Sequence, residues 1–335
     1  MPIRLAALAA MLAAIAPILR GQERGAVYRV PVTGTVEMGL APFVSRSLDE
    51  AAAAGAAAVI LDIDTPGGRI DAAWEIIDAV RDASLPVHAY VNRRALSAGA
   101  MIALSADRLY MRPGSTIGAA TPVVGEGQRA SEKMVSAMRS EFRALAEERG
   151  FDPAIAEAMV DENVAVEGIS EAGRLLTLTT SEAVDLGVAT GVVDDWPTLV
   201  ASVGLGGAPV REMSPNWAER IVRLLTNPLL APLLLSLGFM GLVIEIRTPT
   251  FGLAGAVGLL CLTAFFGARF VVHLAGMEEA ILLAAGTGLI ALEVFVIPGF
   301  GVAGLAGGVT VMTALMLSML GSYPTVSEVI SALGI

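Results

Sequence analysis

The chain has 335 residues, of which 55% are hydrophobic and 16% charged, and its formal net charge is −11. So apolar a composition excludes an ordinary soluble globular protein. The acidic balance and the lack of a basic stripe argue against a nucleic-acid partner. Cys261 is the single cysteine, and the two histidines, His88 and His273, are far apart. An intrachain disulfide is therefore excluded, and we expect neither a metal site nor a cofactor.

Residues 1–24 have the pattern of a signal peptide or membrane anchor. Arg4 precedes the apolar run 5–19, as the charged region precedes the hydrophobic region of a secretory signal. Ala14-Ile-Ala16 resembles a cleavage site, but Pro17 directly after it would hinder cleavage, so an uncleaved anchor stays open. In either case we expect the domain that follows to lie outside the cytoplasm.

Residues 25–203 alternate apolar runs with charged amphipathic stretches, as a globular domain does. Their periodicities predict strands at 27–33, 57–63, 86–92, 108–111, 175–178 and 191–193, and helices at 41–54, 70–81, 97–106, 131–149 and 181–186. This alternation predicts an α/β domain whose parallel sheet is connected by crossover helices. His88 lies in a predicted strand and is expected to be a core or edge residue.

Residues 204–227 are expected to join this domain to the rest of the chain. The stretch 204–215 is rich in Gly and Pro, which is typical of a linker. A helix is predicted over 216–225, with Trp217, Ile221, Leu224 and Leu225 on one face and Glu219, Arg220 and Arg223 elsewhere. Such a helix suits a membrane surface, and equally an ordinary amphipathic helix packed on the domain.

Residues 228–321 are almost continuously apolar and contain an internal repeat. Pro249-Thr-Phe-Gly-Leu-Ala-Gly255 matches Pro298-Gly-Phe-Gly-Val-Ala-Gly304 at an offset of 49 residues. The lengths of the apolar runs predict an all-α membrane domain of two similar hairpins, with spans at about 229–246, 251–268, 278–297 and 301–320. A tail, 322–335, follows. Close helix approach is expected at the small residues Gly252, Gly255, Gly258, Gly301, Gly304, Gly307 and Gly308.

Two acidic residues, Glu245 and Glu293, lie near the ends of predicted spans. Charged residues at membrane depth are often functional. Helix-end groups near the interface are an equally good interpretation, with Glu245 paired to Arg247. We assign neither glutamate to a proton or ion pathway.

Two glycine-containing patterns in the α/β domain point to chemistry. Asp64-Thr-Pro-Gly-Gly68 directly follows a predicted strand, and paired glycines can turn backbone N–H groups towards an oxyanion, although most such pairs are only turns. Leu96-Ser-Ala-Gly-Ala100 follows a strand and opens a helix. A serine there has its hydroxyl at the helix N-terminus, which favours developing negative charge. Its alternative roles are a helix N-cap and a small packing residue.

Lys133 is the only lysine among 22 basic residues. A desolvated lysine can become neutral and accept a proton, whereas arginine stays protonated. Lys133 lies at the start of the predicted helix 131–149. It is a candidate base, and chance retention on a solvated helix face is the alternative.

Three segments carry a resemblance to a known family. They are Val-Ile-Leu-Asp-Ile-Asp-Thr-Pro-Gly-Gly (59–68), Ala-Leu-Ser-Ala-Gly-Ala-Met-Ile-Ala-Leu-Ser-Ala-Asp (95–107) and Pro-Gly-Ser-Thr-Ile-Gly-Ala-Ala-Thr-Pro-Val (113–123). With the Pro-x-Phe-Gly-x-x-Gly repeats, they resemble the NfeD-type membrane serine peptidases, stomatin-operon partners of the ClpP/crotonase-like fold. Long members of that family carry an OB-like β-barrel after the spans. A sequence that stops at Ile335 is then a shorter variant or a fragment.

The resemblance implies a serine endopeptidase with a Ser–Lys dyad. Ser97 would be the nucleophile and Lys133 its general base, and the backbone N–H groups of Gly68 and Ala98, with Gly67 beside them, would form the oxyanion hole. The chemistry agrees, because a serine hydroxyl needs a base and no histidine stands in a matching position. A lysine made neutral by burial would serve.

The resemblance further implies that the protein cuts apolar segments of membrane-associated proteins, with stomatin- or prohibitin-like proteins as candidates. Lipid and a second copy of the chain are the other expected partners. An extended peptide would bind as an added strand beside Ser97. An enoyl-CoA hydratase-like enzyme of the same fold is disfavoured by the acidic charge and the Ser–Lys pair. A non-catalytic membrane scaffold for a stomatin-like protein is the remaining alternative.

Overall fold

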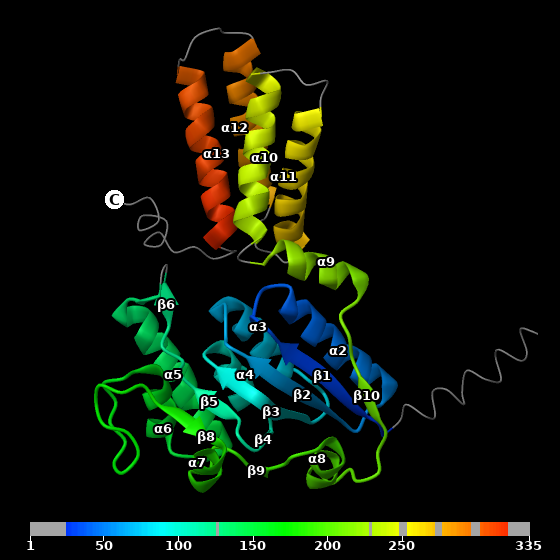
Figure 1. Ribbon diagram of the computed structural model, residues 1–335, viewed down its shortest axis with the longest axis vertical. Coiled ribbons are helices and arrows are strands. Elements are labelled where there is room, and N and C mark those ends of the chain that lie inside the picture. The colour runs from blue at the N-terminus through cyan, green and yellow to red at the C-terminus, as the bar shows by residue number, and fades with distance from the viewer. Residues whose placement is uncertain are drawn as a thin grey trace, which may run out of the picture. The chain divides into compact units, whose positions relative to one another are not determined.

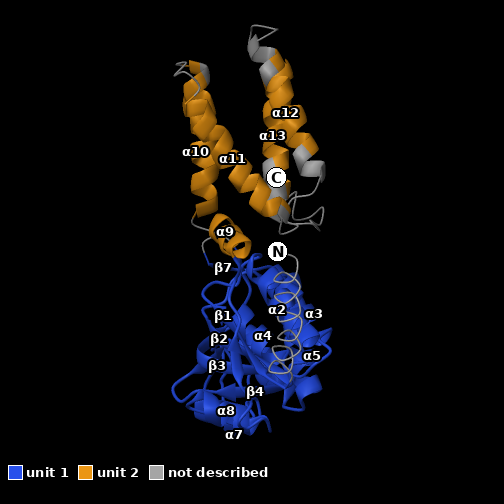
Figure 2. Cartoon of the chain, turned by 90° about the vertical axis from the view of Figure 1, so that its right-hand side faces the viewer, with its two compact units in different colours: residues 1–216 blue, residues 217–335 orange. Residues whose placement is uncertain are grey.

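The computed structural model describes residues 25–124, 127–227, 230–247, 253–271, 277–295 and 302–320. The chain forms two compact units, residues 1–216 and 217–335, which Figure 2 shows in blue and orange. The expected signal or anchor at 1–24 and the tail at 322–335 lie outside the described residues.

The first unit alternates strands and helices, as predicted (Figure 1). Its strands are β1 (Val27–Thr33), β2 (Ala58–Thr65), β3 (Val87–Leu96), β4 (Arg108–Met111), β5 (Thr116–Gly118), β6 (Val123–Val124), β7 (Gln128–Arg129), β8 (Thr177–Thr179), β9 (Gly191–Val192) and β10 (Val210–Glu212). Its helices are α2 (Leu40–Ala54), α3 (Ile70–Arg81), α4 (Ala98–Leu104), α5 (Glu132–Arg149), α6 (Pro153–Val160), α7 (Thr180–Asp185) and α8 (Trp196–Ser202).

Eight of these strands form one sheet, whose main path runs β10-β1-β2-β3-β4-β9. All neighbours along this path are parallel. β3 is long because its first half pairs with β4 and its last three residues, Arg94–Leu96, pair with β5. β8 pairs antiparallel with β5. The α/β class is therefore confirmed, but the sheet is mixed rather than wholly parallel, since it carries an antiparallel edge strand of the kind common in α/β folds.

Helices cover both faces of the sheet. On one face α2, α3, α4 and α5 pack in chain order, over residues such as Leu61 and Val91 that are fully buried. Side chains alternate between the two faces of a strand. Those on the other face of the sheet, such as Ile60, Tyr90 and Tyr110, form a second cluster under α8. Trp196, the first residue of α8, packs edge-to-face on Tyr90 with 5.6 Å between ring centroids.

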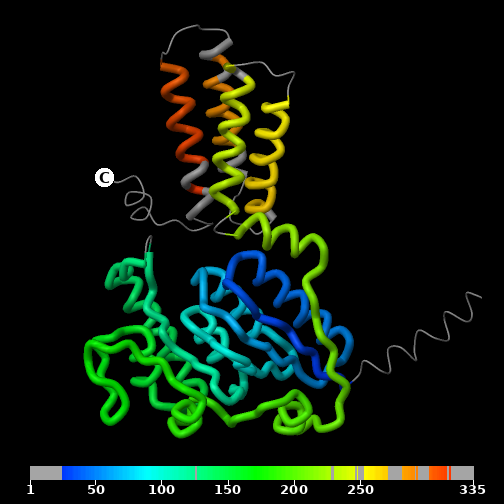
Figure 3. Tube along the Cα trace, viewed as in Figure 1, coloured from blue at the N-terminus to red at the C-terminus, as the bar shows by residue number. Residues whose placement is uncertain are grey.

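The sequence analysis missed several short elements. β10 lies within the stretch expected as a linker, and it returns to pair with β1, as the trace in Figure 3 shows. The first compact unit accordingly extends to Asn216. β10 is three residues long and fully exposed, so it shows no burial periodicity that could be recognised. The helices α6 and α8 are also short, at 8 and 7 residues.

The second unit contains α9 (Trp217–Leu225), α10 (Leu230–Arg247), α11 (Leu253–Val271), α12 (Met277–Phe295) and α13 (Val302–Leu320). α10 packs against α11, and α12 packs against α13, so the described helices form two packed pairs. Within the described residues, Leu253–Phe270 is long and apolar enough to span a membrane, and the count becomes two if α9 and α10 form one broken span. The four predicted apolar helices are therefore present, and at least one of them is long and apolar enough to be a span. Four spans are not confirmed.

In each helix pair the two backbones approach closely at a pair of glycines, one from each helix. A Cβ at Gly258 would lie 2.7 Å from the Gly238 oxygen, and one at Gly307 would lie 2.7 Å from the Gly286 oxygen. Such distances leave no room for a side chain, so the helix backbones touch directly. Close approach at Gly258 and Gly307 is therefore confirmed, whereas Gly308 faces open space.

Glu245 near the end of α10 binds the neighbouring helix of its hairpin. Its Oε2 accepts a hydrogen bond of 3.2 Å from the backbone N–H of Gly255, in the first turn of α11. The first N–H groups of a helix have no intrahelical acceptor, and the positive end of the helix dipole favours a carboxylate there. Glu245 therefore has a structural role at a helix end. The side chain of Glu293 lies outside the described residues.

We predict that Glu245→Ala destabilises the second unit by about 1 kcal/mol, the usual effect of losing a helix cap. Denaturant unfolding in detergent micelles, followed by circular dichroism, measures the change. Thr310→Ala is the matched control, because it removes a 2.8 Å bond to the Ala306 carbonyl inside one helix and leaves the hairpin contacts alone. Equal stability of the Glu245→Ala protein and the control would contradict the capping role.

Candidate functional site

The candidate site lies where β2 and β3 end. These strands are parallel neighbours, with Thr65 opposite Ala95, so their carboxyl ends meet at one edge of the sheet. β2 leads into Gly67-Gly68, and β3 leads into Ser97. Open α/β sheets place their functional groups at this edge, because the turns that follow the strands converge there. The sheet thus brings together two motifs that are 29 residues apart in the sequence.

Ser97 has a strained backbone. Its φ is 54° and its ψ is −121°, a conformation that a residue with a side chain rarely adopts. It immediately precedes α4, but its hydroxyl makes no cap hydrogen bond. Its N–H donates to the Gly118 oxygen at 2.9 Å, which fixes the turn. The half-buried hydroxyl is therefore presented by a sharp strand-to-helix turn, as in a nucleophile elbow, and not used as an N-cap.

Gly67 lies against Ser97. A Cβ at Gly67 would be 2.6 Å from the Ser97 Cβ and 3.2 Å from its Oγ, and the φ of 101° also favours glycine. The Gly67 N–H donates to Thr65 Oγ1 at 3.0 Å. This amide, expected beside the oxyanion hole, is therefore already engaged. Gly67 instead provides the space in which the serine turn fits.

Gly68 forms the second half of this turn and is held by Val36. The Val36 N–H donates to the Gly67 oxygen at 2.9 Å, and the Arg69 N–H donates to the Val36 oxygen at 2.8 Å. A Cβ at Gly68 would lie 2.1 Å from that oxygen. Within the described residues no hydrogen bond engages the Gly68 N–H, so this exposed residue offers a candidate donor.

Ala98 supplies a second available donor. It is the first residue of α4, and the N–H groups of the first helical turn have no intrahelical acceptor. At Gly99, which follows, a Cβ would lie 2.3 Å from Thr65 Cγ2, so α4 sits directly on the end of β2. The helix start and the glycine turn are thus packed together beside Ser97.

Lys133 is the second residue of α5, and it is exposed. α5 packs against α4, the helix that Ser97 precedes. Among the described residues, no hydrogen bond joins Lys133 Nζ to Ser97 Oγ. The expected burial of the lysine is therefore not observed in the free chain, because the first turn of α5 projects beyond the core that Val135 and Met138 enter.

His88 does not belong to the site. It is buried at the start of β3, whereas Ser97 follows the end of that strand. Desolvation lowers the pKa of His88, Asp107 opposes that change and Arg108 adds to it. The imidazole is therefore held neutral in the core, which confirms the prediction of a core residue.

Three supporting residues were not predicted. Thr65 lies inside the Asp-Thr-Pro-Gly-Gly motif and fixes Gly67, and Gly118 lies inside the 113–123 motif and binds the Ser97 N–H. Val36 lies outside all of the recognised motifs. Threonine and glycine in these segments were a signal that could have been followed, whereas Val36 acts only through its backbone, which a sequence does not mark.

The geometry suits acyl transfer. It offers one hydroxyl on a strained turn, a glycine turn packed against it, the start of a helix directly after it, and a lysine on the adjacent helix. Acyl-transfer enzymes use such donors to stabilise the tetrahedral oxyanion. In the residues that the structure describes, no group of His, Cys, Asp and Glu side chains is arranged to hold a metal ion.

Comparison with known proteins agrees with this division of the chain. The family model of the NfeD1b N-terminal domain matches residues 26–213, and that of the NfeD integral membrane domain matches residues 229–335. Membrane protein NfeD1b of Bacillus subtilis is 42% identical, over 88% of this chain and 68% of that protein. Membrane-bound protease PH1510 of Pyrococcus horikoshii is 28% identical, over the same shares of the two chains, 88% and 68%.

Among solved structures, the chain is similar to the 1510-N membrane-bound stomatin-specific protease. A serine-to-alanine variant has a TM-score of 0.51 and 27% identity, and covers 58% of this chain and 99% of its own. A lysine-to-alanine variant, solved in complex with a substrate peptide, has a TM-score of 0.54 and 26% identity. That match covers 61% of this chain and 99% of the solved chain. Two family models and a relative of 42% identity agree. The chain therefore belongs to the NfeD family of membrane proteins.

Proposed function

We propose that this protein is a membrane-bound serine endopeptidase that uses Ser97 as nucleophile and Lys133 as general base. The observation that carries the proposal is the strained turn that holds Ser97 against Gly67 at the start of α4. We propose the N–H groups of Gly68 and Ala98 as its oxyanion hole. Backbone strain persists only where the surrounding structure holds it, and it is concentrated at active sites. The protease names of PH1510 and 1510-N support the same class of reaction.

The reaction would proceed in two acyl transfers. Neutral Lys133 takes the proton from Ser97 Oγ as the oxygen attacks the peptide carbonyl carbon, and the Gly68 and Ala98 N–H groups bind the oxyanion. The tetrahedral intermediate collapses, the C–N bond breaks, and the lysine proton passes to the leaving amine. A water molecule then attacks the acyl-serine in the same manner and releases the acid. No cofactor enters either step.

A neutral lysine is required, and Lys133 is exposed in the free chain. Desolvation by a bound segment would disfavour the charged form of the lysine. We therefore propose that the substrate itself covers Lys133 and completes the site. An apolar peptide would do so better than a polar one, because it brings no water or counter-charge with it.

The substrate class follows from this requirement and from the relatives. We propose apolar segments of membrane-associated proteins, with stomatin- or prohibitin-like proteins as the candidates, since 1510-N is described as stomatin-specific. The expected homodimer stays a prediction. The alternative is a non-catalytic scaffold for the same partner, which is consistent with the plain description of NfeD1b as a membrane protein.

We further propose that the chain is multi-pass, with the peptidase unit outside the cytoplasm and α9 lying at the lipid surface. Trp217, Ile221 and Leu224 share one face of α9 and are 76%, 48% and 56% exposed. The NfeD integral membrane domain begins at residue 229, just after this helix. An apolar helix face continuous with a membrane domain fits the interface, where Trp is favoured and arginines meet lipid headgroups.

The dyad predicts the behaviour of two variants in detergent or nanodiscs. Ser97→Ala abolishes both cleavage of apolar peptides and fluorophosphonate labelling, because the nucleophilic oxygen is gone. Lys133→Arg retains the charge but not the base, so the labelling rate falls by about 100-fold or more. Mass spectrometry of peptide products and gel fluorescence of the labelled protein measure the two effects.

Cleavage and labelling that are equal in the wild type and in both variants would refute the dyad. In that case a pull-down decides the scaffold alternative, because a scaffold retains a stomatin-like partner whether or not Ser97 is present.

The close contact between Gly67 and Ser97 predicts that adding one methyl group at position 67 will slow labelling of the serine. Gly67→Ala forces a Cβ to within 2.6 Å of the Ser97 Cβ, so the serine turn must move. We expect the labelling rate to fall by about 100-fold, the loss typical of a disturbed oxyanion site. Gly114→Ala is the control, since Gly114 also has a positive φ (80°) but open space around it. Equal effects of the two substitutions would mean that general strain, rather than the site, is responsible.

Single-cysteine labelling in intact cells tests the topology. In a Cys261→Ala background, exposed Ser84→Cys in the peptidase unit should react with a membrane-impermeant maleimide. On α9, Arg220→Cys should react, whereas Ile221→Cys should be protected by lipid. Labelling of Ser84→Cys only after cell lysis would place the peptidase unit inside. Equal labelling at 220 and 221 would remove α9 from the interface.

A further inference from the structure

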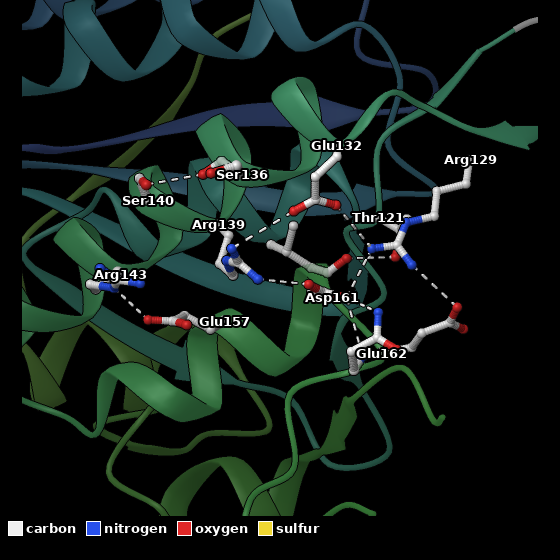
Figure 4. Close-up of polar contacts among 12 residues, drawn as sticks. Thr121, Arg129, Glu132, Ser136, Arg139, Ser140, Arg143, Glu157, Asp161 and Glu162 are labelled. Atoms are coloured by element: carbon white, nitrogen blue, oxygen red, sulfur yellow. Dashed lines mark hydrogen bonds and ion pairs between the residues drawn. The ribbon is translucent and has the colours of Figure 1, made fainter. Parts of the chain in front are cut away.

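Asp161 is a buried carboxylate that joins three segments of the first unit (Figure 4). It follows the last residue of α6, and its side chain is 4% exposed. Oδ1 accepts from Arg129 Nη2 at 2.9 Å and Oδ2 accepts from Arg139 Nη1 at 2.7 Å. Arg129 belongs to β7 and Arg139 to α5, so one carboxylate fixes both elements to the end of α6.

The charge on this carboxylate is secure at neutral pH. Burial by itself would raise the pKa of Asp161. Hydrogen bonds from the backbone and side chain of Asn163 and from Arg129 outweigh burial and hold the pKa below its ordinary value. Two arginines held by a single ionised group make a rigid junction, because charge-assisted hydrogen bonds are short and directional.

The serine side of the site is attached to the same end of α6. Thr121 Oγ1 donates to the Val160 oxygen at 2.7 Å, and the Ala120 N–H donates to the Met159 oxygen at 2.6 Å. These residues follow Gly118, whose oxygen accepts the Ser97 N–H. The segment 118–121 thus connects the serine turn to the residues just before Asp161.

The lysine side is attached through α5. Glu132, the first residue of α5 and the neighbour of Lys133, lies 3.9 Å from Arg129 and 3.9 Å from Arg139. Figure 4 shows both arginines converging on Asp161 from different elements, with Glu132 beside them. Lys133 makes no hydrogen bond of its own within the described structure. Its position therefore depends on how the first turn of α5 is held.

We propose that Asp161 is a positioning residue for Lys133. Through Arg139 and Arg129 it holds the first turn of α5 at a set distance from the segment that carries the Ser97 turn. This proposal rests on the proposed dyad and adds to it a residue that neither touches the substrate nor takes part in proton transfer.

A second ion pair between the same two helices provides a matched control. Arg143 Nε binds Glu157 Oε1, which joins α5 to α6 farther along α5 from Lys133. Glu157→Gln and Asp161→Asn each remove one carboxylate charge from the α5–α6 contact. A purely structural role predicts similar effects of the two substitutions on activity, whereas a positioning role predicts an effect of Asp161→Asn alone.

The experiment measures Ser97 labelling by a fluorophosphonate and cleavage of an apolar peptide by the full chain in nanodiscs. We expect Asp161→Asn to lower kcat by about tenfold or more with KM within about twofold, because the chemistry is affected and binding is not. Glu157→Gln should stay within about twofold of the wild type in both constants. Circular dichroism confirms that each variant is folded.

A double-variant cycle separates positioning from stability. If Asp161 acts through the lysine, adding Asp161→Asn to Lys133→Ala leaves the residual labelling rate unchanged. If Asp161→Asn does not fold, Arg139→Gln breaks the same link while Asp161 keeps Arg129 and Asn163, and Arg139→Lys should recover most of the rate. Loss of the same factor in the Lys133→Ala background, or equal activity of Asp161→Asn and Glu157→Gln, overturns the proposal.

The proposed function and this inference fail in distinguishable ways. A wild type that neither labels at Ser97 nor cleaves peptides removes the dyad, and with it the basis for any positioning residue. A wild type that requires Ser97 and Lys133 but is indifferent to Asp161 removes only the inference.

Discussion

The site depends on one close contact, between the glycine turn after β2 and the serine turn after β3. Ser97 lies so close to Gly67 that a Cβ would not fit at position 67, and Val36 likewise leaves no room for a Cβ at position 68. Because the two turns are pressed together, the Ser97 backbone keeps a conformation that a residue with a side chain would otherwise leave. The packing of β2, β3 and α4 supplies the free energy that holds this strain, so the fold and the reactive geometry are inseparable.

The electrostatic part of the site is built differently. The serine turn is fixed by backbone contacts, whereas Lys133 stands exposed on the first turn of a helix. Behind that turn, Arg129 and Arg139 meet on the buried Asp161 carboxylate, which we propose orients it. A protonated lysine in solvent cannot act as a base. Removing water from around the side chain favours the neutral form, which can accept a proton. In the proposed mechanism, an apolar segment must cover Lys133 before reaction, and this requirement would restrict cleavage to apolar substrates.

The second unit follows the same principle of close backbone contact with different chemistry. Its helices approach through glycines rather than through interlocking large side chains, as is common where lipid supplies no hydrophobic driving force. Glu245 shows that an acidic residue in an apolar helix can satisfy backbone N–H groups instead of carrying ions. The glycine contact occurs in both helix pairs, between Gly238 and Gly258 in one and between Gly286 and Gly307 in the other.

The sequence alone determined the α/β class, the apolar helices of the second unit, the long amphipathic elements and the candidates Ser97 and Lys133, because periodicity, glycine pairs and a unique lysine are local marks. Only the tertiary structure showed that β10 returns to β1, that the Gly67 N–H is bonded to Thr65, and that Lys133 is exposed. It also revealed the roles of Val36 and Asp161. Those roles arise from which backbone and charged groups meet across long separations, and no local pattern of residues records such meetings.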